Sequence, residues 1–374
     1  MGVSVDWAFA RSVAGRVAGD DPFAASYHGG SLESDLLELT TRAEQLVEAE
    51  TGLMSTAGPA RARVTDRLGW VDANLNSFER LLRPLIGRFD QVDEANREQQ
   101  ADGLLAPVSR AVQAVSSVVG PKVAGAELGA MLGWMSSRVL GQYDLLIIED
   151  ERPEDQDLVY YVKPNVLALE KRYGFPPREF RLWIAVHECT HRAQFTGVPW
   201  LRPHFLSLVN ELLDSVDPDP KRFLDAVTET VRETRAGNGP SLSDGGLSAL
   251  LATPEQRETM KKVTGLMSLL EGHGDLIMDR ATHDIIPSQR RFARVMSHRR
   301  QNASGITRLI QRLTGIEAKL AQYEEGEDFV RAVEDAGGRQ LFDLVWSGPE
   351  ALPTIDEIRT PELWIDRVGA TTGA

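Results

Sequence analysis

One string, RLWIAVHECTHRAQF at Arg181–Phe195, limits the folds open to this chain more than any other part of the sequence. It places two histidines, His187 and His191, four residues apart. In an α-helix, residues at that spacing lie on one face, one turn above the other. The five residues before His187 are apolar, which is typical of a helix buried in a protein core. The string therefore predicts a buried helix that presents two imidazole rings to the same point in space.

Two imidazoles in this arrangement can occupy two corners of a tetrahedral zinc site. Glu188 follows the first histidine, so it can accept a proton from a water held by the zinc and later donate it to the leaving group. This is the H-E-x-x-H pattern of the zinc peptidases. Arg192 departs from the extended pattern, which usually has an uncharged residue there. The alternative interpretation is structural: a histidine pair in a core helix with a hydrogen-bonded glutamate.

A hydrolytic zinc needs a third protein ligand and an open fourth position. Glu271 and Asp275 are again four residues apart, on a predicted helix. They resemble the E-x-x-x-D pattern of the thermolysin-like (gluzincin) class, which implies that Glu271 binds the zinc and Asp275 orients a ligating histidine. His273 is the alternative third ligand. It lies about 200° around the helix from Glu271, so both can hardly face one metal.

Glycines at regular spacing predict close helix contacts. Gly125, Gly129 and Gly133 recur every four residues and suggest that another helix approaches this face. Gly272 and Gly274 flank His273, although glycine is a poor helix former, which makes sense if another backbone packs tightly there.

The composition is that of a globular protein, with 42% hydrophobic and 26% charged residues in a chain of 374. A net charge of −14 argues against broad binding to nucleic acid or to an anionic membrane. Cys189 is the single cysteine, so no intrachain disulfide can form, which suits a reducing cytoplasm. Its position between the histidines predicts a core thiol that points off the metal face rather than a nucleophile. The first twenty residues lack the features of a secretory signal, so we expect a cytoplasmic protein.

Helical periodicity dominates the chain, so the expected fold is mainly α. The predicted helices are Trp7–Ala18, Ser34–Thr51, Ala60–Leu82, Ala106–Val119, Pro121–Leu140, Pro176–Phe195, His204–Ser215, Pro220–Arg235, Thr253–Arg280 and Ser288–Leu313. Thr253, Pro254 and Gln256 predict a capping box at the start of one of them. Two short strands, Tyr143–Ile148 and Leu158–Val162, are predicted to form a hairpin.

Other polar groups could stabilise a developing oxyanion, as a histidine, tyrosine or arginine does in many metallopeptidases. The candidates are His283, His298 and Tyr323. A basic run at Ser288–Gln301 contains Arg290, Arg291, Arg294, Arg299 and Arg300. It is either an anion subsite or a solvated, salt-bridged helix face.

Three separate motifs resemble one family. They are HECTHRAQFTGVPWL at His187–Leu201, LLEGHGD at Leu269–Asp275, and a C-terminal pattern of Gln322, Tyr323, Gly326, Glu327, Phe329, Trp346, Pro349, Glu350, Leu352, Pro353, Thr354 and Trp364. Together they resemble the actinobacterial zincin-like family of zinc hydrolases, one branch of which is associated with biosynthesis of the deazaflavin redox coenzyme. The resemblance implies a zincin-like catalytic core with both histidines as ligands, and it names no substrate.

These observations predict three parts: an N-terminal helical region at 1–135, a zincin-like catalytic core at 136–320, and a C-terminal extension packed on the core at 321–374. The preferred function is zinc-dependent hydrolysis by a gluzincin-type peptidase of restricted specificity, which acts on a peptide or small amide. One alternative is a non-hydrolytic binding or assembly protein of deazaflavin biosynthesis with a structural or vestigial zinc site. Another is an amidase or esterase for a small anionic metabolite, which would be favoured if Arg290, Arg291 and Arg294 line the zinc pocket.

Overall fold

The computed structural model describes residues 5–23, 29–100, 106–145, 157–215, 253–301 and 316–372. Within these ranges the chain is mostly helical, with one small sheet, so the expectation of a mainly α fold is confirmed. The chain divides into two compact units, each built from two stretches of sequence. Unit 1 is Met1–Leu39 with Arg61–Phe175, and unit 2 is Thr40–Ala60 with Pro176–Ala374.

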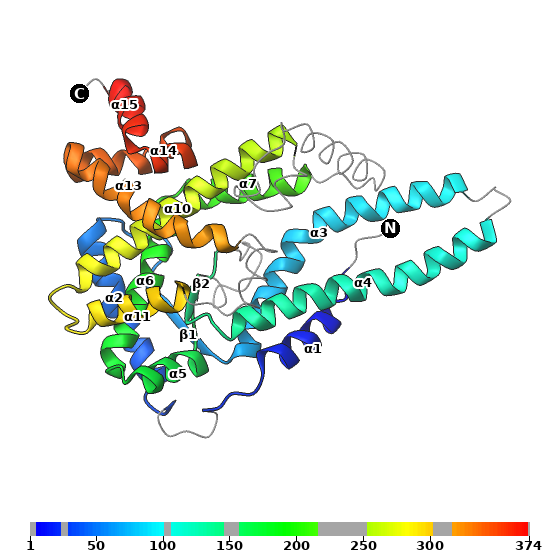
Figure 1. Ribbon diagram of the computed structural model, residues 1–374, viewed down its shortest axis with the longest axis horizontal. Helices are drawn as coiled ribbons and strands as arrows, with labels where there is room; N and C mark the ends of the chain where they lie inside the picture. The colour runs from blue at the N-terminus through cyan, green and yellow to red at the C-terminus, as the bar shows by residue number, and fades with distance from the viewer. Residues whose placement is uncertain are drawn as a thin grey trace. The chain divides into compact units, whose positions relative to one another are not determined.

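Three helices pack side by side in unit 1 (Figure 1): α1 (Trp7–Ala18), α3 (Arg67–Gln100) and α4 (Ala106–Ser136). The three regularly spaced glycines of α4 face the backbone of α1, and a Cβ added at Gly125 would lie 2.6 Å from Asp6 O. The close helix contact predicted from this spacing is therefore confirmed. The prediction of two helices here was wrong, because α4 runs through Pro121, whose carbonyl accepts a hydrogen bond from Asp6 N.

The sheet of unit 1 has the strand order β1-β3-β2. β2 (Gly141–Tyr143) pairs antiparallel with β3 (Leu158–Val162), so the predicted antiparallel pairing is confirmed. The bounds of the first strand differ, because β2 ends at Tyr143, where the predicted strand begins, and residues 146–156 lie outside the described part. β1 (Arg61–Thr65) pairs parallel with β3, with Arg61 opposite Leu158. The prediction of a helix from Ala60 was therefore wrong. The parallel partner of β1 lies far along the chain, so the residues around Arg61 give no sign that they form a strand, and the helix starts only at Arg67.

A further helix of unit 1, α5 (Lys163–Tyr173), was not predicted from the sequence. It follows β3 directly, begins with Pro164 in its first turn, and ends at Gly174 in the left-handed conformation. α2 (Leu32–Thr51) runs through both units.

Unit 2 is organised around the long helix α10 (Pro254–Thr282), which contacts α6, α7, α13 and α14. Its capping box, formed by Thr253 and Gln256, is confirmed. The other elements of the unit are α6 (Pro177–Gly197), α7 (Leu201–Asp214), α11 (Gln289–Gln301), α13 (Ile316–Asp343), η4 (Leu344–Trp346), η5 (Pro349–Ala351), α14 (Ile355–Arg359) and α15 (Pro361–Thr372). The predicted helix Pro220–Arg235 and loop Ala236–Gly246 lie outside the described residues.

Leu269 and Leu276 of α10 pack against Phe329 and Val333 of α13, in a buried cluster that also contains Trp364. Gly272 lies directly against the backbone of Gly326, so the close approach predicted for this glycine is confirmed. One face of α10 is thereby held against α13, while the same helix also packs on α6.

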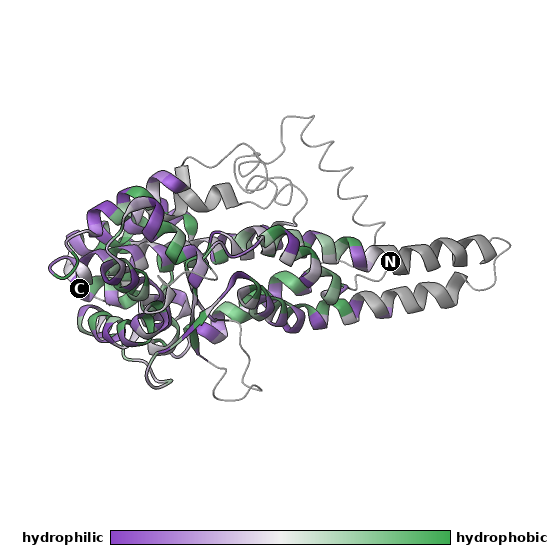
Figure 2. Ribbon diagram, turned by 90° about the horizontal axis from the view of Figure 1, so that it is seen from below, coloured by the Kyte–Doolittle hydropathy of each residue, from purple (hydrophilic) through white to green (hydrophobic). Residues whose placement is uncertain are grey.

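Hydrophobic and hydrophilic residues are interleaved along the helices of both units (Figure 2), as expected for amphipathic helices packed around a core. In the part of the chain that the structure describes, no helix is long and apolar enough to cross a membrane.

Candidate metal centre

Helix α6 supplies the two histidines. It starts with Pro177 at its first position, and most of its residues from Phe180 onward are buried, whereas His187 and His191 are half-buried. Phe180 and Trp183 near its start pack against Phe292 of α11, with ring centroids 5.2 and 5.9 Å apart. This packing fixes the rotation of α6 about its own axis. His187 and His191 then project together, with their Nε2 atoms 3.2 Å apart.

Glu271 reaches the same point from α10. Its Oε2 lies 3.5 Å from His191 Nε2 and 4.0 Å from His187 Nε2. One ligand atom from each of these three residues lies within 4.8 Å of the others, which makes this a group that could hold a metal ion. Two nitrogens and one carboxylate oxygen are a donor set that zinc accepts, with one position left over.

The far nitrogens of both imidazoles face oxygen atoms. His187 Nδ1 lies 3.6 Å from Asp275 Oδ1, and His191 Nδ1 lies 3.0 Å from Gln194 Oε1. If each oxygen takes an Nδ1 proton, both Nε2 atoms keep their lone pairs and face the Glu271 carboxylate. Three acceptor atoms so close together repel one another unless a cation lies among them, so these residues fit a metal ion.

The electrostatic surroundings of His191 also favour a metal cation at this position. Burial lowers the pKa of His191, but the nearby charge of Glu271, a hydrogen bond to that carboxylate and the charge of Glu188 outweigh it, and the pKa is raised to about 9. Surroundings that favour a positive charge on this ring also favour a metal cation beside it. Glu188 itself is buried on α6, next to His187 in the sequence.

Gly274 of α10 lies against the imidazole rings. A Cβ at this position would be 3.2 Å from His191 Cε1 and 3.8 Å from His187 Cε1. The second glycine of the LLEGHGD string therefore leaves room for the histidine side chains, whereas the first, Gly272, leaves room for another helix.

His273 does not join the group of three. It is buried, its Nδ1 lies 2.9 Å from Gln194 Nε2, and its ring stacks on Phe342. Burial, together with the charges of His191 and two arginines, lowers its pKa to about 3, so the ring is neutral. The geometry gives no support to His273 as the third ligand.

Two further residues of the motif, Cys189 and Arg192, make buried contacts away from the candidate metal ligands. Cys189 is buried and its thiol donates to Thr40 O at 3.6 Å, as a core thiol does. Arg192, the departure from the extended pattern, is buried and binds the Glu44 carboxylate and Gly58 O. Its charge is thus neutralised away from the three candidate ligands.

The remaining candidates do not gather at the centre. His283 and His298 are exposed, and Arg290, Arg291 and Arg294 are exposed on α11. The side chain of Tyr323 lies outside the described part of the chain. Gln194 was missed from the sequence. The available signal was its position three residues after His191, on the same helix face.

Comparisons with known proteins agree with this geometry. A family model described as zincin-like metallopeptidase matches residues 5–365. A crystal structure from Chloroflexus aurantiacus, described as a "putative hydrolase with a novel fold", is 29% identical with a TM-score of 0.64, and the match covers 98% of this chain and 99% of that one. No curated protein matches. Because the family model spans nearly the whole chain and includes both helices of the candidate centre, the protein belongs to the zincin-like metallopeptidase family.

Proposed function

We propose that this protein is a zinc-dependent peptidase of the gluzincin type, in which His187, His191 and Glu271 hold the metal. The observation that supports this most strongly is the convergence of two imidazole nitrogens and a carboxylate oxygen, from two helices, within 4.8 Å. Zinc bound there supplies a Lewis acid that polarises the scissile carbonyl and lowers the pKa of a water molecule.

The chain's own residues then move the proton. Glu188 accepts a proton from the attacking water as its oxygen bonds to the carbonyl carbon. The same carboxyl group donates that proton to the amide nitrogen as the carbon–nitrogen bond breaks. Asp275, whose Oδ1 lies 3.6 Å from His187 Nδ1, is the carboxylate placed to favour a proton on Nδ1, which leaves the Nε2 lone pair for the metal.

Two observations favour this function over the alternatives. A structural zinc is normally closed by four protein ligands, whereas the described residues offer three here and His273 is turned to Gln194. This argues against a structural zinc in a binding or assembly protein. The exposed Arg290, Arg291 and Arg294 weaken the case for a subsite that takes a small anionic metabolite. The association with deazaflavin biosynthesis remains a prediction from the sequence resemblance.

Metal content tests the ligand set directly. Plasma mass spectrometry on purified wild type and on Glu188→Gln is expected to find about one zinc per chain. His187→Ala and Glu271→Ala are expected to lose it, whereas His204→Ala, which replaces a histidine of α7, serves as the matched control and keeps it. Wild type that takes up no zinc even when supplied with it would contradict the proposal.

Activity tests the role of Glu188. Wild type loaded with zinc is expected to cleave members of a fluorogenic peptide library, and Glu188→Gln to lose this activity by at least about a hundredfold while keeping its zinc. Activity of Glu188→Gln close to that of wild type would assign the proton transfer to another group.

A further inference from the structure

A chain of hydrogen bonds leads away from the candidate metal centre through Gln194. This side chain is fully buried on α6, one turn after His191. Its Oε1 lies 3.0 Å from His191 Nδ1, and its Nε2 lies 3.0 Å from Leu270 O. The same Nε2 lies 2.9 Å from His273 Nδ1.

The backbone carbonyl of Leu270 decides which way the amide points. A carbonyl oxygen can only accept a hydrogen bond, so the NH₂ group of Gln194 has to face it. The Oε1 atom then faces His191, and because this oxygen also only accepts, His191 Nδ1 has to donate. That places the proton of the neutral ring on Nδ1 and leaves the lone pair of Nε2 for a metal.

His273 completes the arrangement. The NH₂ group of Gln194 has two hydrogens, one for Leu270 O and one for His273 Nδ1, which therefore accepts and leaves the His273 proton on Nε2. The ring is held in place by stacking on Phe342, at 5.4 Å between centroids and 20° between planes, and by an edge contact with Trp346.

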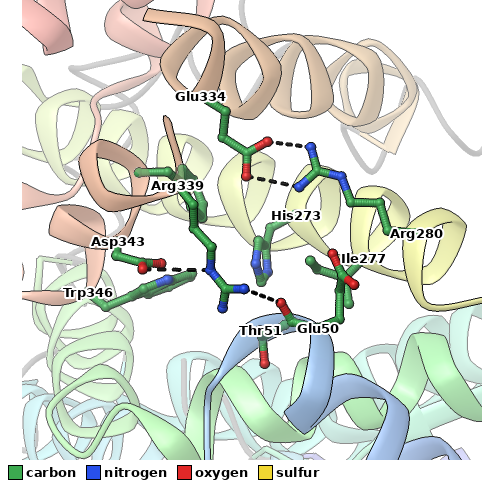
Figure 3. Close-up of a pocket in the computed structure, with 10 residues that line it drawn as sticks. Glu50, Thr51, His273, Ile277, Arg280, Glu334, Arg339, Asp343 and Trp346 are labelled. Atoms are coloured by element: carbon green, nitrogen blue, oxygen red, sulfur yellow. Dashed lines mark hydrogen bonds and ion pairs between the residues drawn. The ribbon is translucent and has the colours of Figure 1, made fainter. Parts of the chain in front are cut away.

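The surroundings of His273 are themselves fixed by ion pairs (Figure 3). His273 lines a pocket together with residues of α2, α10, α13 and η4. Within this pocket Arg280 binds the Glu334 carboxylate, and Arg339 binds Glu50 O and lies 3.7 Å from Asp343. None of the three candidate ligands lines it.

We propose that Gln194 and His273 are positioning residues, which together set the tautomer and the orientation of His191 for metal binding. This rests on the proposed zinc site and extends it. The two candidate histidine ligands face different groups. The Asp275 carboxylate lies beside His187, whereas a neutral amide, directed by Leu270 O and His273, lies beside His191. An amide orients the ring without adding a further negative charge beside Glu271 and Glu188.

Four variants test this, each measured for Zn²⁺ affinity by competition with a chromophoric chelator at pH 7.5. Gln194→Leu removes all the hydrogen bonds made by this side chain and replaces it with one of similar size. His273→Leu keeps much of the volume but removes the acceptor, whereas His273→Asn places Oδ1 where Nδ1 was and keeps it. Thr190→Val is the matched control, since this buried hydroxyl of α6 donates only to Val186 O in its own helix.

We expect Gln194→Leu to weaken zinc binding by about 10- to 100-fold, the usual effect of losing a partner of a metal ligand. His273→Leu should weaken it by a few-fold, because Leu270 O still accepts one hydrogen of the Gln194 amide. His273→Asn and Thr190→Val should bind nearly as tightly as wild type. The visible spectrum of the Co²⁺ forms should change in the two leucine variants, because the direction of His191 changes. The unfolding temperatures of the metal-free variants show whether any of them has simply lost its fold.

If His273 served only in packing, His273→Leu would bind zinc more tightly than His273→Asn, because leucine fills the space beside Phe342 better than asparagine does. Zinc binding of His273→Leu equal to that of wild type, or of His273→Asn as weak as that of His273→Leu, would overturn the inference. Wild type without zinc affinity would overturn the proposed metal site, and the inference with it. That outcome is visible before any variant is compared.

Discussion

At the scale of single residues, the candidate centre depends on which nitrogen of each histidine is free. Asp275 and Gln194 each place an oxygen beside an Nδ1 atom, so that the two Nε2 atoms and Glu271 face one another. The spacing of four residues predicts both pairs, His187 with His191 and Glu271 with Asp275, because it follows from helix geometry alone. Gln194 shares a helix face with His191, but its role depends on Leu270 O and His273, which belong to another helix, so the spacing alone could not assign that role.

Gly274→Ala should weaken zinc binding by about tenfold, since a methyl group 3.2 Å from His191 Cε1 pushes the ring away from its place. The dissociation constant for Zn²⁺ measures this. Gly87→Ala in α3 is the matched control, because a Cβ there meets nothing within 4 Å. Equal weakening in both variants would show that the effect does not come from the histidine rings.

At the scale of helices, the crossing of α10 and α13 holds Glu271 and Asp275 in place. The two helices approach so closely at Gly272 and Gly326 that a Cβ on either would overlap backbone atoms of the other. Glycine at 272 was interpretable from the sequence as a sign of close packing. Its partner could not be identified, because the contact joins two helices whose order in the sequence says nothing about where they cross.

Gly326→Ala should destabilise the protein by about 3 kcal/mol or more, since the added Cβ meets the carbonyl of Ser268 and backbone cannot rotate away as a side chain can. Thermal unfolding with chelator present measures this without a contribution from zinc. Gly87→Ala should leave the unfolding temperature unchanged or raise it slightly. An unfolding temperature of Gly326→Ala equal to that of wild type would contradict the close crossing.

The C-terminal helices have a pH-sensitive contact. Burial raises the pKa of Glu357, but its bonds to Arg367 and to the Thr354 backbone outweigh this and lower it. A carboxyl group whose pKa is lowered by folding stabilises the fold at pH values above its pKa in the unfolded chain, which is about 4.5. This contribution to stability is lost as the pH falls through the lower pKa of the folded state.

Glu357→Gln should therefore lower the unfolding temperature at pH 7 by about 1–2 °C, the effect of about 1 kcal/mol in a protein of this size. The difference from wild type should shrink as the pH falls below 4.5, and unfolding curves at several pH values measure it. Asp366→Asn, a change in the charge of α15 nearby in sequence, is the comparison. A difference that stays constant down to pH 3 would contradict the assignment.

At the scale of the whole molecule, the candidate centre belongs entirely to unit 2, whereas the sheet and the helices α1 and α4 belong to unit 1. A ligand that binds only the folded state stabilises what it contacts, by about 4 kcal/mol at a thousandfold excess over its dissociation constant. Zinc should therefore slow amide hydrogen exchange in α6 and α10 and leave α1 and α4 unchanged. Exchange followed by mass spectrometry, with His187→Ala as the control, measures this; equal protection of α4 would show that both units respond as one.

The sequence by itself determined what depends on neighbours along the chain. Helical periodicity, the capping box at Thr253 and the two four-residue spacings all arise within a few turns, so most helices and the two pairs of polar residues that share a helix face were predicted from them. The assignment of Glu271 and Asp275 to the candidate centre came from the resemblance to the gluzincin pattern. Only the tertiary structure decided that Arg61–Thr65 pairs as a strand, that Glu271 rather than His273 faces the two histidines, and that Gln194 directs His191. Each of these depends on a partner from another element of the fold. Such a contact contributes free energy only when packing brings the two elements together, so the pattern of neighbouring residues along the chain does not predict it.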